Sequence, residues 1–268
     1  MKIKSPAKIN LHLQVINKRN DDYHEIRSVF QLIDLFDEIS FEVTEKEIQL
    51  NQEPYEIKDN LIHKAALSLK EATNSSLGAN ISVKKMIPIG KGLGGGSSDA
   101  ATTLIVLNKL WQTGLTKQEL LEIGLGLGSD VPFFIHGKNC WAEGRGEIFK
   151  QISLQSKLFL LIFPEVNIST KEAFNNLEIE EKTPISKEKF LDGFSFNSFE
   201  NWAKENFYEI ENAFELLKDF GTPRLTGTGS AVFVPLKNQE EGKKALKNFE
   251  KGIIVKSLDD SPLRQLIE

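Results

Sequence analysis

The first strong pattern in the chain is an alternation of apolar and polar residues between positions 9 and 16. Successive side chains of a β-strand point to opposite faces, so the alternation predicts a half-buried strand with one apolar and one polar face. The polar face carries Lys8, Asn10, His12 and Gln14. These residues become important once the chemistry of the chain is considered.

Similar patterns continue a β-rich opening, after which helices appear. Strands are predicted at residues 28–35, 39–44, 47–51 and 79–87. Apolar residues at helical spacing predict a helix at residues 60–72, and a second helix is expected at residues 98–111. Thr116 and Glu119 have the spacing of a capping box, which marks the start of a third helix.

A change in pattern near residue 151 indicates a second folding unit. Residues 158–163 form a fully apolar strand, and Ser169 and Thr170 can cap a short helix after it. Further elements are expected as helices at 199–203, 210–220 and 240–249 and strands at 231–236 and 252–256. The chain is therefore predicted to be an α+β protein with two domains, at residues 1–151 and 152–268.

The composition is that of an ordinary globular protein, with 40% hydrophobic and 26% charged residues in a chain of 268. The longest apolar run is far shorter than the roughly 20 residues that cross a bilayer, so no membrane partner is expected. A net charge of −5 argues against a nucleic-acid partner. A single cysteine, Cys140, excludes an internal disulfide, and the opening residues lack the pattern of a secretory signal, so a cytoplasmic location is predicted.

The most informative segment for chemistry is a glycine cluster between a predicted strand and a predicted helix. Five of the seven residues from 90 to 96 are glycine. Glycine lets backbone N–H groups converge on a ligand, and a helix start adds unpaired N–H groups and a partial positive charge. The cluster is therefore predicted to bind a polyphosphate. The simpler alternative is a flexible turn with Ser97 or Ser98 as an N-cap, but ordering five glycines costs more entropy than one turn requires.

Other phosphate-binding motifs do not fit this segment. Gly90, Gly92 and Gly95 satisfy GxGxxG, but the acidic residue that a dinucleotide-binding fold carries about twenty positions later is missing. A nicotinamide-dependent oxidoreductase therefore rests on the glycines alone. The P-loop fails because neither Lys91 nor Lys138 is followed by serine or threonine. The HRD and DFG motifs of protein kinases are missing as well.

The glycine segment resembles the phosphate loop of the GHMP kinases, a superfamily of small-molecule kinases. Further blocks at residues 6–11, 22–24, 127–134 and 225–230 fit the same family in the same order, so the resemblance covers nearly the whole chain. It implies a ribosomal-protein-S5-like N-terminal domain and a smaller C-terminal domain resembling an α/β plait, with the active site between them. It also implies that ATP is bound by Pro88, Ile89, Gly90, Lys91, Gly92, Leu93, Gly94, Gly95, Gly96, Ser97 and Ser98.

The resemblance implies catalytic roles for Lys8 and Asp130. Asp130 would accept the proton of the substrate hydroxyl, or orient that hydroxyl, during attack on the γ-phosphorus, and Lys8 beside it would offset charge on the transferring phosphoryl group. Read without the resemblance, Asp130 is equally a helix N-cap and Lys8 a solvated strand lysine. Mg²⁺ is expected as a cofactor bridging the ATP phosphates, without a dedicated carboxylate cage, and by analogy with the family the Ser98 hydroxyl is a candidate ligand for it.

The blocks fit most closely a member of the family whose substrate is a cytidine diphosphate ester. This implies that Tyr23 stacks on the cytosine, that His24 contacts its polar edge and that Asn10 also binds substrate. A turn followed by tyrosine and histidine would equally suit structural packing. Phe194 or Phe196 is the candidate for a second aromatic residue over the base.

Two other functions stay open at this point. Another GHMP kinase, of the homoserine or mevalonate type, would have no requirement for cytidine. A nucleotide-binding regulator that has lost catalysis would bind without turnover, although the presence of both Lys8 and Asp130 argues against it.

Overall fold

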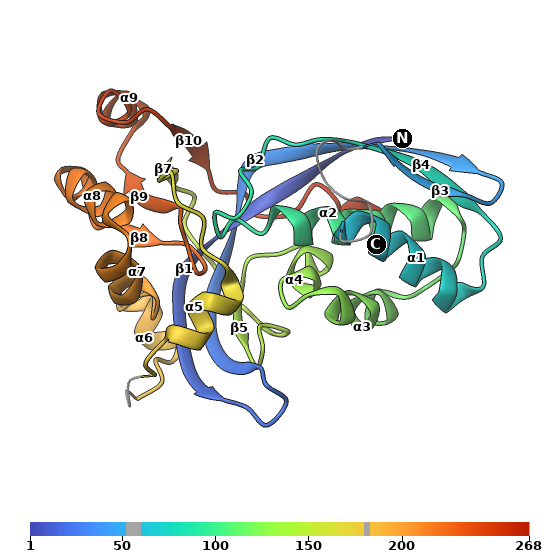
Figure 1. Ribbon diagram of the computed structural model, residues 1–268, viewed down its shortest axis with the longest axis horizontal. Coiled ribbons are helices and arrows are strands. Elements are labelled where there is room, and N and C mark those ends of the chain that lie inside the picture. Colours follow the sequence, from blue (N-terminus) through green and yellow to red (C-terminus); the bar gives the residue numbers. More distant parts are fainter. Residues whose placement is uncertain (52–59, 180–182, 268) are drawn as a thin grey trace.

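One long β-hairpin runs through both lobes of the molecule (Figure 1). The computed structural model describes residues 1–51, 60–179 and 183–267. Strand β1 (Lys2–Lys18) pairs antiparallel with β2 (His24–Thr44), and the register shifts after Pro6, Asn10 and Val15. The strands predicted at 9–16, 28–35 and 39–44 are therefore parts of two continuous strands of 17 and 21 residues.

The first lobe is a six-stranded sheet with its helices gathered on one side (Figure 1). Its further elements are β3 (Ile48–Asn51), α1 (Leu61–Thr73), β4 (Gly78–Lys84), α2 (Gly95–Leu110), α3 (Lys117–Leu127), α4 (Val131–His136), β5 (Cys140–Glu143) and β6 (Ile148–Gln151). Strand β2 has β1 on one side and both β4 and β5 on the other, while β3 and β6 form the outer strands. The short strands β5 and β6 have no counterpart among the predicted elements.

Local sequence signals explain where these helices begin. The predicted capping box is confirmed, because the Thr116 hydroxyl accepts from the N–H of Glu119 and the Glu119 carboxylate accepts from the N–H of Thr116. Helix α2 begins earlier than predicted, and its N-cap is Gly94 with a φ of 70°. The alternative that Ser97 or Ser98 caps this helix is therefore wrong.

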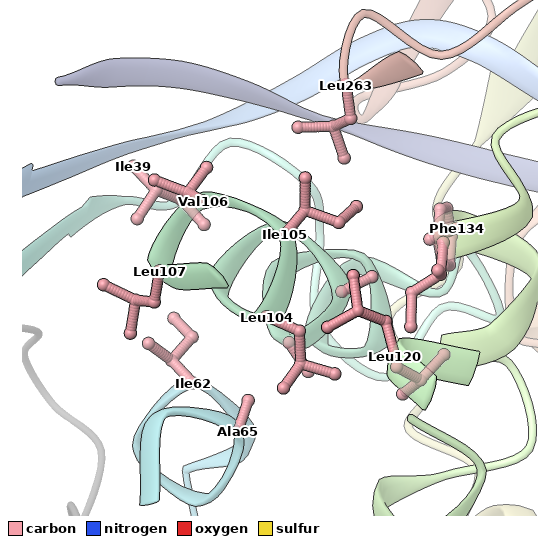
Figure 2. Packing of buried hydrophobic residues seen from close by; sticks show 14 of the residues in the cluster. Ile39, Ile62, Ala65, Leu104, Ile105, Val106, Leu107, Leu120, Phe134 and Leu263 are labelled. Atoms are coloured by element: carbon pink, nitrogen blue, oxygen red, sulfur yellow. The ribbon is translucent and has the colours of Figure 1, made fainter. Parts of the chain in front are cut away.

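The core of the first lobe is built around α2, which lies between the sheet and the other helices. Every residue of α2 from Ser98 to Leu107 is buried. Figure 2 shows Leu104, Ile105 and Leu107 packed among residues of α1, α3 and the sheet. Leu263, from the last residues of the chain, is fully buried in the same cluster and lies next to Ile105 in this view.

The second lobe is a four-stranded antiparallel sheet with the strand order β10-β7-β9-β8. Its elements are β7 (Leu158–Ile162), α5 (Thr170–Asn176), α6 (Lys187–Leu191), α7 (Glu200–Asn206), α8 (Tyr208–Leu217), β8 (Arg224–Leu225), β9 (Val232–Leu236), α9 (Gln239–Leu246) and β10 (Gly252–Lys256), with a 3-10 turn at Lys218–Phe220. A further 3-10 turn at Arg264–Leu266 packs against the first lobe. The core of the second lobe also takes Leu13, Val15 and Ile26 from the hairpin. The mixture of sheets and helices in both lobes agrees with the predicted α+β class.

The prediction that β1 is half-buried is wrong, because its polar residues are buried as well. Lys8, Asn10, His12 and Gln14 are each at most 3% exposed. The edge of β1 that does not face β2 is covered by loops of both lobes, for example by Leu93, whose carbonyl accepts from the N–H of Lys8. The polar side chains therefore face protein and a cavity in place of bulk water.

The predicted division into residues 1–151 and 152–268 stays a prediction. The hairpin supplies residues to both cores, and the end of the chain packs in the first lobe. We therefore propose the two units as successive stretches of the sequence, each of which also contributes residues to the core of the other. Within the described ranges, no helix has both the length and the hydropathy required to cross a membrane.

Leu263 gives a test of whether the end of the chain packs in the core of the first lobe. Leu263→Ala should lower the free energy of unfolding by about 2 to 5 kcal/mol, because it leaves a cavity in the core of the first lobe. Urea denaturation measures the change. Leu191→Ala, at a side chain that is 54% exposed, is the matched control and should change little. Equal stabilities for the two variants would show that the end of the chain is not part of this core.

Candidate active site

A cavity of about 1440 Å³ lies where the two lobes meet, and it is lined by residues of both. Most residues that the sequence analysis singled out face it, although they come from four separate segments. Those that line the cavity are Lys8, Asn10, Tyr23, His24, residues 88–97 and Asp130. The fold thus brings together a predicted phosphate site, a predicted catalytic pair and a predicted base site.

The glycine loop between β4 and α2 has the backbone shape that only glycine adopts easily. Gly90, Gly92 and Gly94 have φ values of 68°, 73° and 70°, in the left-handed region where a Cβ is strained. The first bond inside α2 runs from the N–H of Ser98 to the carbonyl of Gly94 at 2.8 Å. The N–H groups of residues 95–97 therefore have no partner inside the helix, and the start of α2 has the form of an anion-binding site.

Ser98 differs from the other loop residues, because it lies beneath the loop and does not line the cavity. Its side chain is fully buried, and its hydroxyl accepts from the Ser5 hydroxyl at 2.8 Å. Thr102 donates to the same Ser5 hydroxyl at 3.1 Å. This chain of hydroxyls joins α2 to β1, so the structure gives the Ser98 side chain a role in packing.

Lys8 is a buried lysine whose three N–H donors have three acceptors. Its Nζ is 2.6 Å from Oδ1 of Asn10, 3.0 Å from the carbonyl of Gly92 and 3.4 Å from Oδ2 of Asp130. Its side chain is 3% exposed, whereas that of Asp130 is 34% exposed. A buried charge is costly unless it is paired, so Lys8 is fixed in place by these partners. The alternative of a solvated strand lysine is wrong.

Asp130 occupies the N-cap position of α4, yet its side chain makes no capping hydrogen bond. The carboxylate instead faces the cavity beside the Lys8 ammonium. A helix that begins with Val131 and Pro132 needs little capping, because proline at this point lacks the N–H that a cap would satisfy. The capping alternative therefore does not account for this carboxylate.

Asn10 holds the two lobes together at the catalytic pair. Its Oδ1 accepts from Lys8 and, at 3.0 Å, from the N–H of Gly227, and its Nδ2 donates to the Ser28 hydroxyl at 2.8 Å. Its backbone N–H donates to the Thr226 hydroxyl at 3.1 Å. The side chain is 3% exposed, so its contacts within the protein position Lys8.

The far end of the cavity is aromatic. Tyr23 is 46% exposed, and the guanidinium carbon of Arg145 lies 3.3 Å from the centre of its ring. The ring of His24 lies 4.7 Å from that of Phe174, centre to centre, and all four side chains line the cavity. Burial lowers the pKa of His24, with a smaller effect from Lys18, so the imidazole is neutral near pH 7 and can both donate and accept a hydrogen bond.

The two phenylalanines proposed from sequence as partners of Tyr23 do not line this cavity. Phe194 is 64% exposed, and Phe196 packs edge-on against the buried His12 at 5.0 Å. Phe174 of α5 lines the cavity instead, beside His24. No signal in the sequence separates Phe174 from the other aromatic residues of the second lobe.

An ionic cluster next to the glycine loop was also missed from sequence, and its members Lys85 and Asp99 line the cavity. The Lys85 ammonium bonds to the Asp37 carboxylate and, at 2.7 Å, to that of Asp99. Asp37 accepts in addition from the N–H groups of Met86 and Ile87, which fixes the start of the loop. Burial raises the pKa of Asp99, whose Oδ1 has no hydrogen-bond partner.

The family model and the relatives that match this chain agree with each other. A family model described as the GHMP kinases N terminal domain matches residues 60–138. The chain is 43% identical over 270 residues to the 4-diphosphocytidyl-2-C-methyl-D-erythritol kinase of Acinetobacter baumannii (strain ACICU), covering 98% of each chain. It is 39% identical over 269 residues to the protein of the same name from Pasteurella multocida (strain Pm70), covering 98% of this chain and 91% of that one.

Solved structures agree with these sequence matches. A crystal structure of 4-(cytidine 5'-diphospho)-2C-methyl-D-erythritol kinase has a TM-score of 0.84 and 30% identity, covering 96% of this chain and 99% of its own. The mevalonate kinase of Methanococcus jannaschii has a TM-score of 0.70 but 18% identity, covering 96% of this chain and 98% of its own, so the likeness is one of fold alone. The fold class expected from the sequence resemblance is confirmed.

The glycine loop gives a test of anion binding. A side chain at Gly96 would meet only Leu61, at 3.6 Å, whereas one at Gly95 would press on Ile87 in the core. Gly96→Val should therefore fold normally but lose affinity for a nonhydrolysable ATP analogue by at least about tenfold, because its methyl groups enter the space beside the free N–H groups.

Calorimetry measures that binding, and circular dichroism checks the fold. Gly126→Val is the matched control, since Gly126 is also an exposed helical glycine, has nothing within 4 Å of its added Cβ and lies outside the cavity. Undiminished binding by a folded Gly96→Val variant would mean that the start of α2 does not hold the phosphates.

Proposed function

Because the chain belongs to the 4-diphosphocytidyl-2-C-methyl-D-erythritol kinase family of the GHMP kinases, we propose that its cavity transfers the γ-phosphoryl group of ATP to a hydroxyl of that cytidine diphosphate ester. The protein is a small-molecule kinase with an alcohol as acceptor, and its reaction belongs to isoprenoid precursor biosynthesis. The observation that carries the assignment of residues is the Lys8–Asp130 pair, 3.4 Å apart between the glycine loop and the aromatic end.

The ATP phosphates lie on residues 88–97 in this proposal. Three N–H groups at the start of α2 lack partners inside the helix, and the helix adds a partial positive charge at the same point. Ser98 contributes to the shape of this site by bonding to Ser5 below the loop. Its side chain is not part of the proposed contact with ATP.

Mg²⁺ is proposed as the cofactor that neutralises charge on the phosphates during transfer. Within the described part of the chain, no cluster of three or more His, Cys, Asp or Glu side chains could hold a metal ion. A site without such a cluster fits Mg²⁺, because proteins commonly bind this ion through substrate phosphates and water with few side-chain ligands. We therefore assign no residue of this chain as a dedicated metal ligand.

The substrate hydroxyl lies between Lys8 and Asp130 in the proposed mechanism. Its oxygen attacks the γ-phosphorus while the bond from that phosphorus to the oxygen bridging to the β-phosphorus breaks, so ADP leaves. The hydroxyl proton passes to the Asp130 carboxylate, which accepts no capping bond and is open to the cavity. Lys8, held by Asn10 and Gly92, supplies a fixed positive charge beside the transferring group.

The cytidine end of the substrate lies at the aromatic end of the cavity in this proposal. Tyr23 offers an exposed ring face, and Phe174 supplies a second aromatic surface beside His24. The neutral imidazole of His24 can bond to a base edge as donor or acceptor. Arg145, which packs on Tyr23, adds a positive charge beside the part of the cavity that a diphosphate would cross.

The relatives favour this acceptor over the homoserine and mevalonate types. Relatives of about 40% identity over nearly the whole chain are named for the cytidine diphosphate ester, whereas the mevalonate and homoserine kinase structures share at most 19% identity. Purified protein with Mg-ATP and a panel of alcohol acceptors would test the choice through ADP formation. A location in the cytoplasm, where its ATP is found, is part of the proposal.

The proposed role of the Asp130 carboxylate can be tested by substitution. Asp130→Asn keeps the shape of the side chain but cannot accept a proton, so kcat should fall at least about a hundredfold while affinity for an ATP analogue stays unchanged. Asp219→Asn, at an exposed residue of the second lobe, is the control and should leave kcat unchanged. If Asp130→Asn had normal turnover, the carboxylate would not be the base.

The proposed cytosine-binding end of the cavity gives a further prediction. Tyr23→Ala and Phe174→Ala should each weaken use of the cytidyl substrate by about 1 to 3 kcal/mol, the usual effect of losing one base stack. ATP affinity should not change. Phe194→Ala is the matched control, since Phe194 is exposed and lies outside the cavity. Steady-state kinetics with varied acceptor decide the matter, and equal effects of Phe174→Ala and Phe194→Ala would contradict the assignment of Phe174.

A further inference from the structure

The glycine loop of the first lobe rests directly on a loop of the second. A Cβ added at Gly92 would lie 2.0 Å from the carbonyl oxygen of Thr226, so no other residue fits there without moving one of the loops. On the other side of the contact, a Cβ at Gly227 would lie 3.2 Å from the Cα of Gly92. The N–H of Ala231 donates to the carbonyl of Lys91 at 3.3 Å.

The side chain of Lys91 extends this contact further into the second lobe. Its Nζ is 2.6 Å from the carbonyl oxygen of Val166, 2.8 Å from that of Pro164 and 3.0 Å from the hydroxyl of Ser230. The Ser230 hydroxyl itself donates to the carbonyl of Val166 at 2.6 Å. A fourth oxygen, Oδ1 of Asn167, lies 3.4 Å from Nζ. The three nearer acceptors match the three donors of an ammonium group, and all four acceptors belong to residues that follow β7 or precede β9.

These acceptors are neutral, which distinguishes Lys91 from a lysine held by a surface ion pair. Among the residues that the structure describes, no carboxylate forms an ion pair with Lys91, since the nearby Glu165 pairs with Lys251. Burial lowers the pKa of Lys91, with a smaller effect from the charge of Lys251. Hydrogen bonds from the ammonium group to these oxygens therefore do more than place a positive charge. They also restrain the position of the loop that carries the lysine.

We propose that Lys91 is a positioning residue that ties the phosphate-binding loop to the second lobe and so holds the loop in its anion-binding shape before ATP arrives. Five glycines in seven residues would otherwise lose much conformational entropy when the ligand orders them. A tie formed in the free protein removes that cost from the binding step, which is preorganisation. The inference rests on the proposed role of the loop in ATP binding.

Lys91→Met is the direct test, because methionine keeps an unbranched stem and removes the three donors. In the free variant, amide hydrogen exchange should be at least about fivefold faster at residues 89–94 and 165–167 than in the wild-type protein. The dissociation constant for a nonhydrolysable ATP analogue should rise roughly 10- to 100-fold, about the effect of losing one hydrogen bond to a charged group. Changes in kcat at saturating ATP should stay within about threefold.

Two further variants distinguish the tie between the lobes from a direct effect of the lysine charge on ATP. Lys84→Met makes the same substitution at an exposed lysine outside the cavity, and it should alter neither exchange nor binding. Lys91→Arg keeps the charge, but a longer planar group does not match the three acceptors of an ammonium, so its ATP affinity should fall as well. Normal ATP affinity in Lys91→Arg together with weak affinity in Lys91→Met would overturn the tie in favour of the charge.

The exchange measurement on free protein keeps this inference distinct from the proposed function. Unchanged exchange at both segments in Lys91→Met would overturn the tie, whatever the enzyme binds. If the wild-type protein failed to bind the ATP analogue, the proposed function would fail, and exchange would still decide whether Lys91 links the lobes.

Discussion

The outer edge of strand β1 is the constraint on which the site depends. An unpaired strand edge presents N–H and carbonyl groups that need partners, and here loops from distant parts of the chain supply them. Lys8 donates to Leu93 of the glycine loop, Asn10 to the Thr226 hydroxyl and Leu13 to the carbonyl of Phe196. One strand edge therefore gathers the phosphate loop and two segments of the second lobe around the same few residues.

Buried charge is handled in two ways close to this edge. The Lys8 ammonium donates hydrogen bonds to an amide and a carbonyl oxygen and forms an ion pair with a partly exposed carboxylate. Next to the glycine loop, Lys85 lies between the carboxylates of Asp37 and Asp99, and Asp37 in addition holds two backbone N–H groups. Removing one partner from either cluster would leave an uncompensated charge, which is why such groups fix the geometry around them.

The two lobes also divide the chemistry between them. The glycine loop, Lys8 and Asp130 belong to the first lobe, whereas Phe174 and the Thr226–Gly227 turn belong to the second. Asn10 bonds to both lobes, since its Oδ1 accepts from Lys8 and from Gly227. Its predicted role as a ligand of the substrate stays a prediction, and its contacts within the protein already explain why an amide stands at this position.

The sequence by itself determined those parts of the protein that depend on local chemistry. The glycine cluster predicted an anion site because glycine adopts a positive φ without strain, as it does at Gly90, Gly92 and Gly94. The capping box at Thr116 was correct for the same local reason. The resemblance of ordered blocks added Lys8, Asp130, Tyr23 and His24, all of which line one cavity.

Only the tertiary structure decided what depends on contacts between distant segments. Alternation in β1 predicted a solvent-facing polar side, but Lys8 and Asn10 are buried because loops some 80 and 215 residues away cover them. Phe174, and not Phe194 or Phe196, faces the cavity, since the packing of α5 sets which aromatic ring lies beside His24. Ser98 points into the core because α2 begins at Gly95, and no sequence pattern specifies which of the two serines in its first turn the helix buries.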